Sequence, residues 1–141
     1  MELQNWGGDM DIKQIGYEVI GAAMRVHSHF GAGYLEEVYK NALIVELREH
    51  GMVAESEVPI AIDYHGVRVG DYRADIMVEH RMIVELKVVS MLLKRHEAQL
   101  VNYLVATGIN DGILLNFGVE SLQYKHKFRI HHNPVNLVNP V

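Results

Sequence analysis

Residues 73–87 read RADIMVEHRMIVELK and carry the clearest structural pattern in this chain. On both sides of the polar residues 79–81, successive side chains alternate between two faces, which predicts two strands joined by a turn. Residues 82–89 are apolar on both faces, as is typical of a central strand that is buried on both sides. A turn at 79–81 pairs Val78 with Met82 and thereby sets the register of the hairpin.

This register places Asp75 directly opposite Glu85, and Arg73 opposite Lys87. Two carboxylates that face each other across a sheet repel, so the arrangement is favourable only if a positive charge lies between them. A divalent cation fits, because Mg²⁺ is usually held by one or two carboxylates together with water and phosphate oxygens. Lys87, on the face of Glu85, could then orient or deprotonate an attacking water, or stabilise charge on a phosphate. The alternative is a surface hairpin whose acids pair with Arg73 and Lys87.

Three short motifs carry a resemblance to a known family. Asp75 followed by residues 85–87 (ELK) resembles the D…(D/E)xK signature of the PD-(D/E)XK, or restriction-endonuclease-like, nuclease superfamily. Residues 96–103 (HEAQLVNY) resemble the Q-x-x-x-Y helix of its RecB-like exonuclease branch, and residues 33–39 (GYLEEVY) fit the motif of the GxxExxY protein family in that superfamily. A D…ExK pattern alone is weak, whereas three motifs at domain-scale spacing are strong. The match runs from about Ile12 to Arg129, nearly the whole chain.

The resemblance implies a fold, an activity and a metal site. The fold is a mixed α/β sheet flanked by helices, with the αβββαβ core of restriction-endonuclease-like nucleases. The activity is Mg²⁺- or Mn²⁺-dependent hydrolysis of phosphodiester bonds in nucleic acid, with DNA favoured over RNA. The resemblance also implies that Asp75, Glu85 and the Leu86 carbonyl hold the metal, and that Glu36 adds a further active-site acid.

A helix predicted at residues 94–107 carries His96, Gln99 and Tyr103 on one face, at positions i, i+3 and i+7. We expect this polar stripe to face the hairpin site. By likeness to the RecB-like branch, Gln99 and Tyr103 support the metal-bound water and a substrate phosphate. We expect Lys87 to act on the attacking water together with Gln99, and His96 to contact the phosphate together with Tyr103. The alternative is a half-exposed helix whose polar residues point toward water.

Glu36 has two interpretations, which are compatible. Gly33 can cap the second helix, so that Glu36, three residues later, is the reciprocal capping carboxylate and a favourable charge at a helix start. Glu36 also continues an apolar stripe with Tyr39 and Leu43, which directs it toward the interior or a cleft. Tyr39 is predicted either to contact the substrate or to be a core aromatic whose hydroxyl is satisfied.

Composition limits the class of protein. The chain has 141 residues, 49% hydrophobic and 22% charged, which is typical of one ordinary globular domain. We expect a single nuclease-like domain at residues 11–130, between an irregular start (1–10) and a flexible tail (131–141). No cysteine is present, so disulfides, thiolate zinc sites and cysteine nucleophiles are excluded. We find no export signal and no membrane-spanning run, and we predict a cytoplasmic location.

Net charge bears on the substrate. The 13 Lys and Arg residues against 18 Asp and Glu residues give −5, the wrong sign for gripping duplex phosphates over a broad surface. Substrate contacts are predicted from Lys94, Arg95 and Arg73. Lys94 and Arg95 could form a local positive rim with Lys125, Lys127 and Arg129. A small footprint, a strand end, a single strand or help from a partner is therefore favoured over tight nonspecific duplex binding.

The remaining patterns predict the element order α, α, β, β, β, α, β, β, a mixed α/β sheet with helices packed on it. Helices are predicted at 11–29, 34–50 and 94–107, and strands at 58–64, 67–78, 82–89, 112–117 and 122–130.

Two other functions remain open at this stage. One is a catalytically silent module of the same fold that binds nucleic acid or a protein, as a homodimer or as a partner-activated subunit. The other is a small-molecule phosphodiesterase, which would need a closed pocket that sequence cannot reveal.

Overall fold

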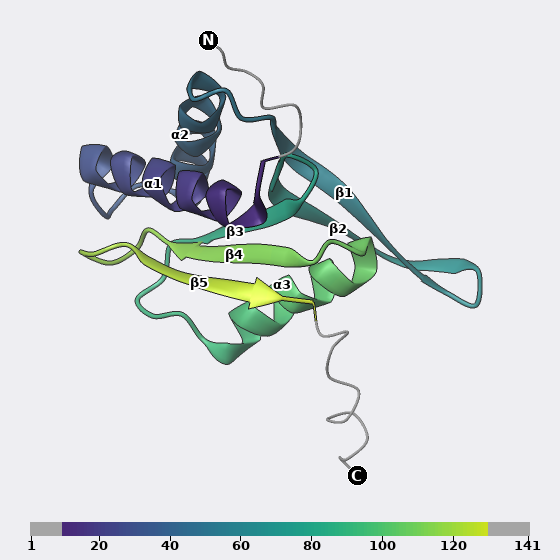
Figure 1. Ribbon diagram of the computed structural model, residues 1–141. Helices are drawn as coiled ribbons and strands as arrows, with labels where there is room; N and C mark the ends of the chain where they lie inside the picture. Colours follow the sequence, from purple (N-terminus) through teal and green to yellow (C-terminus); the bar gives the residue numbers. More distant parts are fainter. Residues whose placement is uncertain (1–9, 130–141) are drawn as a thin grey trace.

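The computed structural model describes residues 10–129, which form a five-stranded mixed sheet with helices on both faces (Figure 1). The predicted element order and the mixed α/β fold class are confirmed. The predictions for residues 1–9 and 130–141 lie outside the described residues. The elements are α1 (Ile12–Phe30), α2 (Glu36–Glu49), β1 (Ala54–Tyr64), β2 (Val67–Val78), β3 (Met82–Lys87), α3 (Lys94–Thr107), β4 (Asp111–Asn116) and β5 (Gln123–Phe128).

The strands lie in the order β1-β2-β3-β4-β5. β1, β2 and β3 form an antiparallel meander, β3 and β4 are parallel, and β5 is an antiparallel edge strand. A parallel neighbour needs a crossover connection, and α3 provides it between β3 and β4. Figure 1 shows α1 and α2 on one face of the sheet and α3 on the other.

The sheet separates two hydrophobic cores. The core under α1 and α2 includes Val84 and Leu86 of β3, whereas the core under α3 includes Ile83 of the same strand. β3 is therefore buried on both faces, as its apolar pattern predicts. Because side chains alternate along a strand, Glu85 and Lys87 share the α3 face with Ile83.

α2 begins later than predicted. Its first residue is Glu36, and Leu35 is the N-cap, without a side-chain capping bond. Gly33 lies in the preceding loop with φ 121°, a conformation that favours glycine, and the Tyr34 N–H donates to the Tyr39 hydroxyl at 3.1 Å. The prediction that Gly33 and Glu36 form a capping pair is therefore wrong, because the loop is held by Tyr39 instead.

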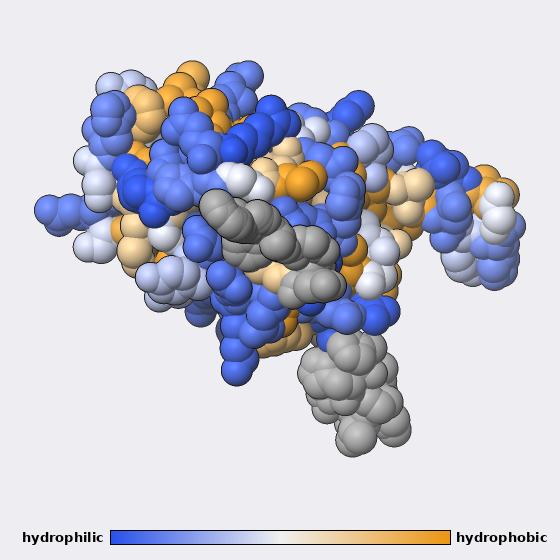
Figure 2. All heavy atoms as spheres, turned by 45° about the horizontal axis from the view of Figure 1, so that its top comes forward, coloured by the Kyte–Doolittle hydropathy of each residue, from blue (hydrophilic) through white to orange (hydrophobic). Residues whose placement is uncertain are grey.

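β1 and β2 form a long hairpin that projects beyond the rest of the sheet (Figures 1 and 2). Its turn contains His65 (φ 51°) and Gly66 (φ 80°), the left-handed conformations that a tight hairpin turn requires. β1 starts at Ala54 rather than at residue 58. Glu57, with φ 54°, interrupts the alternation of side chains along β1. The residues before it therefore do not show a strand pattern in the sequence.

Two predicted strand ends are too long. β3 ends at Lys87, and β5 covers only Gln123–Phe128. After β3, the buried Asn116 side chain accepts from the Val89 N–H (3.0 Å) and donates to the Val89 carbonyl (2.9 Å), so a side chain replaces the ladder there. Within the described residues, no helix is long and apolar enough to cross a membrane.

Candidate active site

The β2–β3 hairpin has the register predicted from its sequence, with Val78 opposite Met82. The ladder ends at Ile76 opposite Val84, directly before the predicted metal ligands. β2 then continues its pairing with β1 alone. The candidate site therefore lies where two central strands part.

Asp75 and Glu85 face each other across this split. The Asp75 N–H donates to Glu85 Oε2 at 2.8 Å, and the Leu86 N–H donates to Asp75 Oδ2 at 2.8 Å. Each carboxylate thus takes a backbone donor from the opposite strand, where a regular ladder would have used a carbonyl. The two acids are fixed by the backbone itself.

The protein holds these acids in an unfavourable electrostatic environment. Glu85 is 5% exposed. Burial raises the pKa of its carboxyl to about 9, and the nearby Asp75 carboxylate acts in the same direction. Without a cation, the pair therefore retains a proton at neutral pH.

A divalent cation is compatible with this donor set. Two facing carboxylates supply the number of protein ligands that Mg²⁺ usually takes, and a metal would offset the repulsion between them. Within residues 10–129, no group of three or more His, Asp or Glu side chains is arranged to hold a metal ion. The fit therefore rests on the Asp75–Glu85 pair together with backbone and substrate oxygens.

Lys87 lies beside the acids, at the end of β3. Its Nζ donates to Gln99 Oε1 of α3 at 3.5 Å, so the helix stripe does meet the hairpin at this point. The predicted pairing of Arg73 with Lys87 does not occur, because the strands have parted. Arg73 is paired with Pro59 of β1, and its side chain donates to the Glu57 carbonyl at 3.4 Å.

Tyr103 follows Gln99 by one helical turn and is 7% exposed. Burial raises the pKa of its hydroxyl to about 12, and the charges of Glu85 and Asp75 contribute. These contributions place Tyr103 in the field of the acid pair. A hydroxyl with this pKa stays protonated and acts as a donor, not as a base.

His96 has a structural role that its sequence spacing does not reveal. Its Nδ1 accepts the Leu93 N–H at 2.9 Å, which caps the start of α3. Burial lowers the pKa of the imidazole, and Lys87 and Arg95 add to this effect. The ring is therefore neutral, and the bond at Nδ1 assigns the proton to Nε2.

Glu36 approaches the acids from the other helical layer, at the first residue of α2. Partial burial raises the pKa of its carboxyl, and the Asp75 charge raises it further. Glu36 and Asp75 line one depression of about 450 Å³, with an ion pair between Lys40 and Glu57 on its wall. A third carboxyl group thus adjoins the pair without joining it.

Tyr39 is a core residue. Its side chain is fully buried and stacks on Phe117, with ring centroids 4.7 Å apart. The hydroxyl donates to the Gly31 carbonyl and accepts from the Tyr34 N–H. Of the two predicted roles the structure supports the structural one, and the predicted substrate contact is wrong because no part of Tyr39 reaches the surface.

The predicted positive rim is smaller in the structure. Lys125 and Lys127 both bind Glu97, at 3.3 and 2.8 Å, so this one carboxylate offsets one of their two positive charges. Lys94 and Arg95 are exposed, and neither forms an ion pair with another residue between 10 and 129. Arg95 therefore supplies free positive charge one turn before Gln99.

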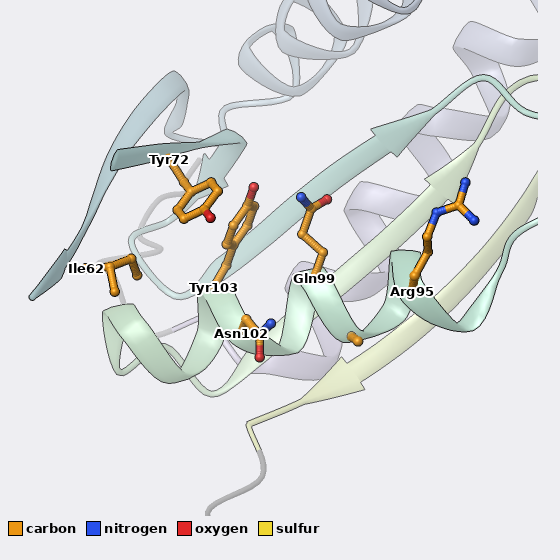
Figure 3. A pocket seen from close by; sticks show the side chains of 7 residues that line it. Ile62, Tyr72, Arg95, Gln99, Asn102 and Tyr103 are labelled. Carbon is orange, nitrogen blue, oxygen red and sulfur yellow. The ribbon is translucent and has the colours of Figure 1, made fainter. Parts of the chain in front are cut away.

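A groove of about 440 Å³ opens beside Gln99 and Tyr103, between α3 and the β1–β2 hairpin (Figure 3). It is lined by Ile62, Tyr72, Arg95, Ala98, Gln99, Asn102 and Tyr103. Tyr72 is a lining residue that was not predicted from the sequence. The available signal was its position two residues before Ala74, on the strand face that turns toward α3.

Comparisons with known proteins bear on the family and the fold of this chain. The sequence model of the PD-(D/E)XK nuclease superfamily matches residues 13–129. The crystal structure of SSO0001 superposes with a TM-score of 0.53 and 20% identity, over 74% of this chain and 59% of that one. The chain thus spans less than two thirds of that protein. Comparison with curated protein sequences finds no match.

A second solved structure is the alkaline exonuclease LHK-Exo from Laribacter hongkongensis. It superposes with a TM-score of 0.46 and 12% identity, over 90% of this chain and 87% of that one. The narrower resemblance to the GxxExxY family depends on residues 33–39 and stays a prediction. The family match covers all of β1 to β5 and both halves of the D…ExK motif, and the chain therefore belongs to the PD-(D/E)XK nuclease superfamily.

Proposed function

We propose that this chain is a Mg²⁺- or Mn²⁺-dependent nuclease that hydrolyses phosphodiester bonds of DNA. The observation that carries the proposal is the facing pair of Asp75 and Glu85 with Lys87 held beside it by Gln99. The family match supports the same class of reaction. Glu85 is a buried acid whose ionisation is opposed by burial and by a neighbouring carboxylate. Such a group has a cost in stability, which a functional site explains and a structural one does not.

Asp75, Glu85 and the Leu86 carbonyl would hold the metal. Glu36 is close enough to Asp75 for the two carboxyl groups to interact, so its charge would change the affinity of the site for the metal. When bound, a divalent metal lowers the pKa of a water and offsets charge on the phosphate. The protein residues hold the acids ready for it, because backbone donors already fix one oxygen of each carboxylate.

Lys87 would orient the attacking water or stabilise charge on the phosphate. An ammonium group has three donors, and Gln99 Oε1 accepts one of them. The remaining donors can bind a water or a phosphate oxygen. Gln99 would position Lys87 through Oε1 and contact the attacking water through its amide NH₂ group.

Tyr103 and His96 would contact the substrate phosphate as neutral donors. The raised pKa of the Tyr103 hydroxyl keeps its proton in place, and the lowered pKa of His96 leaves a single donor at Nε2. Neutral donors of this kind bind a phosphate oxygen without adding repulsion toward a metal.

The experiment is cleavage of labelled single-stranded, duplex and branched DNA and of RNA, in Mg²⁺, Mn²⁺ or EDTA. We expect metal-dependent cutting by the wild type and none by Lys87→Ala. Lys13→Ala, which changes an exposed lysine at the start of α1, is the control and should cut like the wild type. Equal cutting by wild type and Lys87→Ala would contradict the assignment.

One observation favours a second candidate, a non-catalytic binding module or a subunit that needs a partner or a second copy. The net charge of −5 has the wrong sign for broad contacts with the phosphates of nucleic acid. Metal binding separates the two candidates, because an intact Asp75–Glu85 pair that binds neither Mg²⁺ nor Mn²⁺ at millimolar concentration favours the binding module.

A further inference from the structure

The groove between α3 and the β1–β2 hairpin contains an aromatic ring that the proposed chemistry does not use. Tyr72 stands on the hairpin wall and is 49% exposed. Its ring centroid lies 5.7 Å from that of Tyr103, with the planes inclined by 44°. Figure 3 shows the two rings side by side, so Tyr103 supports one side of Tyr72 while part of the Tyr72 ring stays open to solvent.

The groove is continuous with the candidate active site. Gln99 and Tyr103 line the groove, and the same two residues connect to the acids and to Lys87. Gln99 joins the groove directly to the active site, because its Oε1 accepts a hydrogen bond from Lys87 Nζ. Anything bound against Tyr72 therefore lies next to the group that reacts.

The lining of the groove matches the parts of a nucleotide. Ile62, Ala98 and the tyrosine rings form apolar walls, and Asn102 and Gln99 offer amide groups. Arg95 lies toward the other end of α3 in Figure 3, where its guanidinium is free of ion pairs with residues 10–129. An aromatic platform followed by a cation is the arrangement by which proteins bind a base and the phosphate of the same strand.

Size and charge favour an unpaired nucleotide over a duplex. A groove of about 440 Å³ falls in the range of small-ligand sites, about 300–1,000 Å³, so it admits one or two nucleotides and not a helix. A base can stack on the ring of Tyr72 only if one face of the base is free. In a duplex, both faces of an internal base are already stacked on neighbouring bases. The net charge of −5 also weakens the broad phosphate contacts that duplex binding needs.

We infer that this groove binds an unpaired nucleotide next to the scissile phosphate, with its base stacked on Tyr72 and its backbone directed past Gln99 toward Arg95. The inference rests on the proposed nuclease function and names its substrate class, which is single-stranded DNA or a single-stranded end. Tyr72 is a substrate-binding residue in this account and takes no part in the chemistry.

The test is binding of a single-stranded DNA oligonucleotide that carries the fluorescent base 2-aminopurine, whose emission is quenched on stacking. The cleavage-blocked Lys87→Ala protein is the background, in the presence of Mg²⁺. Adding Tyr72→Ala should weaken single-strand binding by about 5- to 150-fold and remove the quenching. Tyr72→Phe, which keeps the ring, should retain both.

The matched control is Tyr64→Ala, which removes another exposed tyrosine of the same hairpin outside the groove. It should bind like the parent, and a thermal melt checks that each variant is folded. Unchanged affinity and quenching in Tyr72→Ala would overturn the inference, as would equal loss of single-stranded and blunt duplex binding. A parent protein that binds no single-stranded DNA would overturn it as well.

Cleavage by otherwise wild-type protein separates this inference from the proposed function. If the wild type cuts DNA and Tyr72→Ala cuts single strands at the same rate, with unchanged binding, the groove is not the nucleotide site although the nuclease assignment stands. If the wild type binds and quenches the oligonucleotide at Tyr72 but cuts nothing in any metal, the groove stands and the nuclease assignment fails.

Discussion

Asp75 and Glu85 are joined across the split in the sheet by a hydrogen bond from the Asp75 N–H to Glu85 Oε2, at 2.8 Å. The bond holds the Glu85 carboxyl group in a place where burial and the neighbouring Asp75 carboxylate both oppose its ionisation. The fold therefore loses stability at this point, and removing the charge of Glu85 or binding a cation should restore it.

Replacing Glu85 should change how stability depends on pH. The pKa of Glu85 is about 9 in the folded protein, above its ordinary value of 4.5, so the folded state binds more protons between these values. The free energy of unfolding of the metal-free wild type should therefore fall as pH rises from about 5 to about 9. Glu85→Gln keeps the acceptor for the Asp75 N–H without the charge, and should lose most of this slope.

The measurement is urea unfolding in EDTA at several pH values. Glu49→Gln, at the exposed end of α2, is the control and should keep the wild-type slope. At pH 9 we expect the urea midpoint of Glu85→Gln to lie above that of the wild type. Parallel stability curves for wild type and Glu85→Gln would show that the acid pair is not strained.

Metal should restore the stability that the acid pair loses. Mg²⁺ or Mn²⁺ at a hundredfold excess over its Kd should stabilise the wild type by about 2.7 kcal/mol, and binding should tighten as pH rises because a proton must leave the pair. Thermal melts with and without metal measure this. Asp75→Asn should abolish the shift, whereas Asp63→Asn on the exposed hairpin should keep it; a shift that survives in Asp75→Asn would place the metal elsewhere.

Gln99 should affect the rate of cleavage and leave metal binding unchanged. Gln99→Ala removes the acceptor that holds Lys87 Nζ, so cleavage should fall by about 10- to 100-fold, while the metal-induced shift in Tm stays unchanged. Gln14→Ala, on the exposed face of α1, serves as the matched control. Wild-type cleavage by Gln99→Ala would mean that the contact with Lys87 has no catalytic role.

Two substitutions of Tyr103 should distinguish the role of its hydroxyl in cleavage from the role of its ring in packing. Tyr103→Phe removes only the donor hydroxyl, so cleavage should fall with little change in Tm, whereas Tyr103→Ala should destabilise the fold by roughly 3–5 kcal/mol. The pH–rate profile should show no ionisation of this hydroxyl below about 12. Full activity in Tyr103→Phe would leave Tyr103 as a core residue alone.

The sequence predicted those parts of the fold that depend on local patterns. The alternation from Met82 to Lys87 predicted a central strand, and the Val78–Met82 register followed from turn length. The helix predicted at residues 94–107 has these bounds in the structure and ends at Gly108, whose φ of 76° gives a left-handed C-cap that a single residue encodes.

The parts that sequence could not predict depend on contacts between distant residues. The divergence of β2 and β3 beyond Ile76 left Arg73 without the predicted neighbour, and nothing in the alternation signals it. The loop before α2 is held by the bond from the Tyr34 N–H to the Tyr39 hydroxyl, and α2 begins after this loop, later than predicted. The strand pattern places Tyr72 on the face toward α3, but its contact with Tyr103 exists only in the folded structure.

The most direct test of the central claim compares Mn²⁺ binding and DNA cleavage in wild type and Lys87→Ala. Manganese binding is followed by electron paramagnetic resonance, and cleavage is followed on a labelled single strand. The account predicts that both proteins bind Mn²⁺ with similar affinity and that only the wild type cuts. Equal cleavage by both proteins, or a wild type that binds no Mn²⁺, would contradict it.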